Sequence, residues 1–315
     1  MLLFSGFMHI SCLGEEAAEK NEVSSPEIEK LLLKGKDEDG QKQYKDALST
    51  YKEALLLADK SASTGLWLKI AGRVAKVLDE LNDFKQTEAL YREILETSEK
   101  FHGKEAPETA IALGHLAEIL RELRKVEEAE SLLRRSLAIT EATYGKNDPH
   151  VALRLSRLAA VLDRTASAKE VEALLRRALE ISEAAYGKND PKIAIRLDTL
   201  ALQLIEQKDF FEAELMLQRA LKIVEDAYGK DDPKLGNPLG ELALLFLSTK
   251  RYHEAEPLQR RMLEIFVKDE VKTGQQNKDF RSDLKHYADL LRQMGDTPEQ
   301  IKEKVDKITE PPRKK

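Results

Sequence analysis

The sequence predicts an all-α protein, a right-handed superhelical solenoid of stacked antiparallel helix pairs. The hexapeptide YGKNDP at 144–149 returns at 186–191 and, as YGKDDP, at 228–233, so each copy follows the last by 42 residues. Charged residues make up 34% of the 315-residue chain and aromatic residues only 6%, which is typical of helices with charged outer faces. A fixed period of this length indicates supersecondary units that bury their apolar faces by stacking on neighbours.

The first helix of each unit is predicted from apolar columns that keep the 42-residue period. The columns are three and four residues apart, which places them on one helical face. One column is alanine in every copy: Ala75, Ala117, Ala159, Ala201 and Ala243. The column one residue earlier reads Val74, Leu116, Leu158, Leu200 and Leu242. We expect this face to pack in the core of the solenoid.

A second helix follows in each unit and carries its own apolar column: Leu90, Leu132, Leu174, Met216 and Leu258. Its starts have a capping residue followed three positions later by Glu or Gln. The pairs are Asp83 with Gln86, Ser167 with Glu170, and Asp209 with Glu212. This spacing predicts a reciprocal capping box, in which each side chain bonds the backbone N–H of the other residue.

The repeated hexapeptide is interpreted as a joint between units. Its glycine supplies the left-handed residue that ends a helix, its aspartate caps the next helix, and its proline occupies the first turn. The joint residues are Gly145, Asp148, Pro149, Gly187, Asp190, Pro191, Gly229, Asp232 and Pro233. A phosphate-binding loop is excluded because Gly229-Lys230 has neither the upstream glycine nor the following Ser or Thr. A calcium loop is excluded because the alternating acidic ligands are missing.

Together these features resemble the tetratricopeptide repeat in the 42-residue form found in kinesin light chains. The segments FEAELMLQRAL at 211–221 and HEAEPL at 253–258 match the start of that family's second helix closely. The resemblance covers roughly residues 27–294 and departs from the pattern at Thr87, Val171 and Ala106. Paired asparagines typical of kinesin light chains and the basic clamp for chaperone tails are both missing from the first helices.

Three segments are expected along the chain. Residues 1–26 form an apolar N-terminal segment with a polar linker. Residues 27–294 form the solenoid, with about six to seven helix pairs. Residues 295–315 form a capping helix, begun by Thr297 with Gln300 completing its cap, and a basic tail.

The N-terminal stretch MLLFSGFMHISCLG leaves two interpretations open. It resembles a bacterial lipoprotein signal with Cys12 as the lipid anchor, although no Lys or Arg precedes the apolar residues. Alternatively it docks on the fold or has no fixed structure. We expect a cytoplasmic protein, with an exported or envelope lipoprotein as the alternative. No apolar run reaches the roughly 18 residues needed to predict a transmembrane span.

Composition argues against several function classes. Lys and Arg number 51 against 57 Asp and Glu, and the net charge of −6 argues against nucleic-acid binding. The single cysteine, Cys12, excludes internal disulfides and cysteine-based zinc sites. The six histidines have no ligand spacing, and no nucleophile with a base is recognisable. We therefore predict that the protein is not an enzyme and that it has no catalytic residues, metal site or cofactor.

The family resemblance implies that the first helix of each unit lines a concave groove that binds a protein or peptide partner. Carrying the register over gives these groove positions: Lys69, Arg73, Lys76, Arg121, Leu153, Arg157, Ile195, Asp198, Leu202, Ile205, Leu244 and Leu247. The late positions are apolar, and either a partner or the curvature of the solenoid and its own terminal helix covers them. The predicted function is a non-catalytic interaction scaffold. The alternative is a regulatory solenoid that senses a peptide and changes its superhelical pitch.

Overall fold

The computed structural model describes residues 25–60, 62–162, 168–274, 277 and 279–309. All regular structure in these residues is helical, with fourteen α-helices and one short 3-10 helix. The chain forms two compact units, Met1–Ile139 and Thr140–Lys315, which are described separately below. The predicted fold class, an all-α solenoid of helix pairs, is confirmed.

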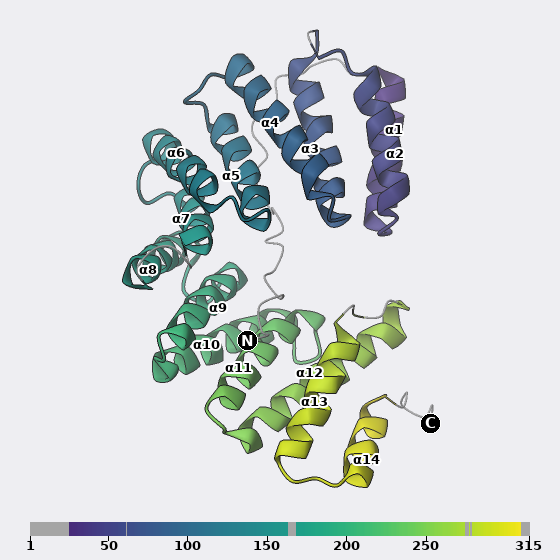
Figure 1. The fold of residues 1–315 in the computed structure, drawn as a ribbon, viewed down its shortest axis with the longest axis vertical. Helices are drawn as coiled ribbons and strands as arrows, with labels where there is room; N and C mark the ends of the chain where they lie inside the picture. Colours follow the sequence, from purple (N-terminus) through teal and green to yellow (C-terminus); the bar gives the residue numbers. More distant parts are fainter. Residues whose placement is uncertain (1–24, 61, 163–167, 275–276, 278, 310–315) are drawn as a thin grey trace. The chain divides into compact units, whose positions relative to one another are not determined.

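Consecutive helices pack side by side within each unit (Figure 1). The first unit holds α1 (Pro26–Gly40), α2 (Tyr44–Leu57), α3 (Thr64–Glu80), α4 (Phe84–Phe101), α5 (Pro107–Glu122) and most of α6 (Val126–Tyr144). The second unit holds α7 (Pro149–Leu162), α8 (Ala168–Tyr186), α9 (Pro191–Glu206), α10 (Phe210–Tyr228), η1 (Pro233–Leu235), α11 (Gly236–Ser248), α12 (Tyr252–Thr273), α13 (Phe280–Gln293) and α14 (Pro298–Thr309).

The predicted core columns are buried. Every member of the alanine column is at most 1% exposed, and the neighbouring Val/Leu column is at most 4% exposed. Alanine has no side chain beyond Cβ, so the facing helix can approach closely at this position. The 42-residue register read from the sequence is therefore the packing register of the helices.

The joints adopt the predicted backbone with one correction. Gly145, Gly187 and Gly229 have φ of 89°, 88° and 93°. However, ψ of Gly229 is 169°, so this glycine is not in the left-handed helical region but in the mirror image of the extended region. That region is essentially restricted to glycine. The joint therefore turns the chain sharply away from the helix axis, and a left-handed cap with Asn would not replace it.

The aspartates of the joints cap the next helix as predicted. Asp148 Oδ1 accepts the backbone N–H of His150 at 2.9 Å, and Asp190 Oδ1 accepts that of Lys192 at 2.8 Å. The third joint repeats the bond at 2.9 Å. Each bond satisfies one of the N–H groups that the first turn of a helix leaves without a partner.

The tyrosine of each joint packs on the residue that follows the proline, a contact not predicted from sequence. Tyr144 stacks on His150 with ring centroids 4.8 Å apart. Lys234 Nζ lies 3.6 Å from the centroid of Tyr228, and the middle joint has the same arrangement at 4.2 Å. An exposed cation–π contact of this kind contributes about 0.5–1 kcal/mol.

The predicted capping boxes form only in part. Asp83 and Asp209 accept the N–H of Gln86 and Glu212, each at 3.2 Å. The reciprocal bond is missing because the N–H of Asp83 and of Asp209 closes the preceding helix on Leu78 and Leu204, at 3.0 and 2.9 Å. Ser167 lies outside the described residues. The Thr297–Gln300 box is complete, with bonds of 2.8 and 3.3 Å.

Turns inside the helix pairs contain non-glycine residues with positive φ. Asn82, Arg124, Lys208 and Lys250 have φ between 58° and 65° and recur at multiples of the 42-residue period. The residue after each one donates its N–H to a carbonyl five residues earlier, which is the closing bond of a Schellman motif. Because none of these residues is glycine, sequence inspection did not reveal the motif.

A column of arginines connects four of the second helices, α6, α8, α10 and α12, to the preceding helix pair. Arg219 donates to Glu183 at 2.5 Å and to the backbone oxygen of Lys188 at 2.6 Å. The same pair of bonds, to a glutamate 36 residues earlier and a carbonyl 31 residues earlier, is made by Arg135, Arg177 and Arg261. The accepting carbonyl always belongs to a lysine that follows a glycine of positive φ, so the arginine and the glycine act together.

Gly229→Ala tests the backbone requirement at the joint. A Cβ there meets no atom within 4 Å, so only the disfavoured φ and ψ oppose it, and we expect a loss of about 1–3 kcal/mol. The matched control is Gly72→Ala in α3, also free of neighbours but without positive φ, which should gain about 0.5–1 kcal/mol. Thermal unfolding of both variants checks this. Equal changes in the thermal stability of the two variants would contradict the requirement for glycine at position 229.

Arg219→Met tests the arginine column. It removes a charge-assisted bond and leaves the Lys188 carbonyl without its partner, so we expect a loss of about 1–2 kcal/mol after allowing for partial exposure. Lys222→Met is the control, because its ion pair with Asp226 is exposed and contributes only about 0.3–0.5 kcal/mol. Urea unfolding measures the loss of stability in both variants. A loss in Arg219→Met no larger than in Lys222→Met would show that the arginine column does not stabilise the stack.

Candidate functional site

The first helices form the inner layer of the second unit. α9 and α11, first helices of consecutive pairs, contact each other directly, whereas the second helices α10 and α12 make no comparable contact among the described residues. Helices on the inside of a curved stack lie closer together than those on the outside. We call the exposed face of α9 and α11 the inner wall of the second unit.

The candidate residues of the first unit lie on α3 and α5 and are largely engaged. Lys69 and Lys76 are exposed, and Lys76 pairs with Asp39 at 3.2 Å. Arg73 and Arg121 are half-buried, and Arg121 pairs with the adjacent Glu122. This part of the predicted groove is charged, as its composition indicated, and the ion pairs of Lys76 and Arg121 are made within the chain.

The apolar candidates of the second unit remain accessible to different degrees. Leu153 on α7 and Ile195 on α9 are half-buried. Leu202, Ile205 and Leu247 are also half-buried, while Leu244 is 42% exposed. The curvature of the stack and the terminal helix therefore do not bury these positions completely, and an apolar surface remains on α9 and α11.

Arginines on α7 and α9 are more buried than the sequence indicated. Arg157, proposed from sequence as a groove residue, is only 3% exposed, which leaves little of its surface for a partner. Arg154, which the sequence analysis did not single out, is 2% exposed. Burial lowers the pKa of Arg196 to about 10, and the charge of Arg157 contributes to this decrease.

Two carboxyl groups of the inner wall lie where ionisation is unfavourable. Burial raises the pKa of Asp198 on α9 to about 8, with a further contribution from the charge of Glu241 on α11. Burial alone raises the pKa of Glu241 to about 7. Asp198 Oδ1 and Glu241 Oε2 are both buried and accept no hydrogen bond from the described residues. The sequence predicted Asp198 as a residue of the wall but not Glu241. Glu241 lies one residue beyond the position that is equivalent to Asp198 in the next helix pair.

The arginine pairs at 134–135, 176–177 and 260–261 do not form a free basic stripe. Arg135, Arg177 and Arg261 belong to the column described above. Arg176 bonds Glu212 and Glu172 at 2.6 and 2.7 Å. These bonds raise the pKa of Arg176 further above its ordinary value. These arginines therefore belong to ion pairs on the outer face of the helix pairs.

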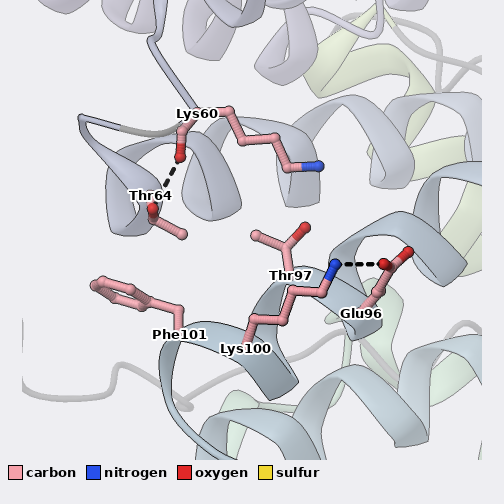
Figure 2. Close-up of a pocket in the computed structure, with 6 residues that line it drawn as sticks. All are labelled: Lys60, Thr64, Glu96, Thr97, Lys100 and Phe101. Atoms are coloured by element: carbon pink, nitrogen blue, oxygen red, sulfur yellow. Dashed lines mark hydrogen bonds and ion pairs between the residues drawn. The ribbon is translucent and has the colours of Figure 1, made fainter.

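A pocket of about 300 Å³ in the first unit is lined by Lys60, Thr64, Glu96, Thr97, Lys100 and Phe101 (Figure 2). Its cations are already engaged. Lys60 Nζ pairs with Glu93 at 2.7 Å and lies 4.2 Å from the ring centroid of Trp67, and Lys100 pairs with Glu96 at 2.5 Å. This pocket therefore has no unused charge with which to select a ligand.

No cluster of three or more His, Cys, Asp or Glu side chains suited to a metal occurs among the described residues. Within the same residues, no helix is both long and apolar enough to cross a membrane. Cys12, the candidate lipid anchor, lies outside the described part of the chain.

The sequence matches the profile of the tetratricopeptide repeat over residues 68–142, 108–184 and 193–266, more than half of the chain. The chain therefore belongs to the tetratricopeptide-repeat family, and its repeats are of the kinesin-light-chain type. A search of curated proteins finds no match.

Several solved structures share this fold. BtubC (BKLC) from P. vanneervenii is 18% identical, with a TM-score of 0.57, over 81% of this chain and 95% of its own. A putative kinesin light chain of Podospora anserina with nearly identical repeats is 19% identical, with a TM-score of 0.55, over 64% and 96%. A Rap protein complexed with Competence and Sporulation Factor is 17% identical, with a TM-score of 0.56, over 91% and 77%. At these identities the likeness establishes the fold alone.

Asp198→Asn combined with Glu241→Gln tests the raised pKa values. A carboxyl whose folded pKa exceeds its unfolded value of about 4 binds its proton more tightly when folded, so stability falls as pH rises from about 4 to about 8. The amide variant does not titrate. The thermal midpoint of the variant minus that of the wild type should therefore increase by about 2–4 °C or more as the pH is raised from about 5 to about 8.5.

The control for this experiment is Asp226→Asn combined with Glu180→Gln, two exposed acids on second helices of the same unit. Its midpoint should follow the wild type across this range. A gap between the Asp198→Asn/Glu241→Gln variant and the wild type that stays constant with pH would show that the two carboxyls titrate normally.

Proposed function

We propose that this protein is a non-catalytic scaffold that binds a partner protein or peptide on the inner wall of its repeats. The observation that carries the proposal is the surface of α9 and α11, where Leu202, Ile205, Leu244 and Leu247 remain accessible on the inside of the stack. Apolar surface of this kind on a soluble repeat array marks an interaction site.

Other features of the chain support a binding role. The tetratricopeptide-repeat fold is generally an interaction scaffold without catalysis. A peptide lying along the wall would meet apolar side chains that exclude water and charged groups that select its register.

A second candidate is a regulatory solenoid that changes its superhelical pitch when a peptide binds. The fold similarity to the Rap protein solved with Competence and Sporulation Factor favours this candidate. Units joined by short, repeated contacts also allow small rotations at each joint to add along the stack. Small-angle scattering with and without the bound peptide distinguishes the two, because only the regulatory solenoid changes its radius of gyration.

Leu202→Asp combined with Leu244→Asp tests the binding surface. Placing two charges on the apolar wall should weaken partner binding by about 100-fold or more, because each charge must be desolvated in the complex. Affinity capture with the native protein identifies the partner, and titration of that partner against both proteins measures the loss.

The control is Phe211→Asp combined with Leu215→Asp on α10, where the two side chains are 76% and 48% exposed. Circular dichroism establishes that both variants fold. Full retention of the partner by the Leu202/Leu244 variant, or equal losses in the two variants, would contradict binding on the inner wall.

A further inference from the structure

The exposed face of α10 differs from that of the other second helices in the 42-residue register, α4, α6, α8 and α12. Phe211 and Leu215 are 76% and 48% exposed, and they share one helical face with the exposed Gln218 because the three are four and three residues apart. We call Phe211, Leu215 and Gln218 the α10 stripe. In place of Phe211 the other helices carry Lys85, Glu127, Lys169 and His253, and in place of Gln218 they carry Arg92, Arg134, Arg176 and Arg260.

The stack does not need apolar side chains at the α10 stripe. The position of Leu215 is taken in the other four helices by Ala89, Ser131, Ala173 and Pro257, all of them exposed. An apolar side chain that stays in water adds little to folding, because the hydrophobic gain is proportional to the area removed from water. One helix has therefore exchanged a charged outer face for an apolar one, and exposed apolar surface of this kind is typical of an interaction site.

Ion pairs with an excess of acid lie on both sides of the α10 stripe. On the side of α8, Arg176 bonds Glu172 and Glu212 at 2.7 and 2.6 Å. On the side of α12, Arg251 bonds Glu214 at 2.5 Å and a second glutamate at 2.6 Å. Each arginine neutralises one of its two carboxylates, so each side keeps one negative charge next to the apolar side chains.

An amphipathic helix with basic residues beside its apolar face is complementary to this surface. The α10 stripe extends for about 10 Å along the helix axis, at about 1.5 Å per residue. A helix lying along it presents apolar side chains at the same spacing of three and four residues, and its Lys or Arg residues meet the excess acid on either side. A second copy of this chain is a poorer occupant, because pairing stripe with stripe brings like charges together.

We propose that the α10 stripe binds an amphipathic helix of a partner protein, with Lys or Arg on both sides of the apolar face of that helix. This surface is separate from the inner wall, which is formed by α9 and α11, so the inference does not depend on the proposed function. It adds a second binding surface on a second helix. With both surfaces occupied, the chain joins two partners.

The test uses the full chain and a phage-displayed library of peptides of about 18 residues, long enough to form a helix. The stripe variant is Phe211→Ala with Leu215→Ala, which removes the apolar surface, keeps both sets of ion pairs and places a strong helix former at both positions. The library is first depleted of phage that bind the stripe variant and is then selected on the wild type. We expect the selected peptides to have an apolar helical face flanked by Lys or Arg.

The tightest peptide is then synthesised as selected and with Glu in place of its Lys and Arg residues. Fluorescence anisotropy should show that the selected peptide binds the stripe variant about tenfold or more weakly than the wild type, and that the Glu peptide binds the wild type more weakly too. Leu202→Asp with Leu244→Asp is the control and should bind the selected peptide as the wild type does. Equal binding by the stripe variant and the wild type, or selected peptides with acidic flanks, would overturn the inference.

Sedimentation equilibrium without peptide tests a second copy of the chain as the occupant. The wild type and the stripe variant should have the same mass in solution. A dimer that the wild type forms and the stripe variant does not would assign the stripe to a second copy and overturn the inference. Failure to select any peptide would also overturn it, and neither result changes the proposed function of the inner wall.

Discussion

The structure depends on the bond between a column arginine and the joint of the previous unit. Arg219 reaches the carbonyl of Lys188 only because Gly187 turns the chain with a positive φ. The same arginine holds Glu183 on the helix that precedes the joint. One side chain therefore fixes the end of a helix, the direction of the turn and the position of the next unit's second helix, and the repetition of these contacts keeps the register constant.

The constant register determines what the inner wall can present. Because the apolar columns of the first helices are committed to the core, only the positions between them face the inside of the stack. These positions carry different residues in each unit, Gly72 in one and Asp198 in another, while the core columns stay the same. The scaffold thus separates the residues that maintain the fold from the positions of the inner wall that vary from one helix pair to the next.

Local sequence patterns predicted the repeat, the core columns and the joints because each depends on residues close in the chain. The capping boxes were predicted less well, because the N–H groups of Asp83 and Asp209 bond the carbonyls of Leu78 and Leu204 in the turn and are not left for the side chain three residues later. The positive φ at Asn82 and Lys208 was missed because the turn imposes this conformation on residues whose types do not predict it. The burial of Asp198 could not be predicted either, since it depends on how closely α9 and α11 approach.

The spacing of the column contacts also has a consequence for how such a chain can grow. Each arginine finds its partners 36 and 31 residues earlier, so an insertion of one or two residues within a helix between them would rotate the arginine away from both. A tandem duplication of one complete 42-residue unit would instead reproduce every bond at the new boundary. The contacts that stabilise the stack therefore favour growth by whole repeats. Duplication of a complete repeat lengthens the stack and keeps every arginine contact.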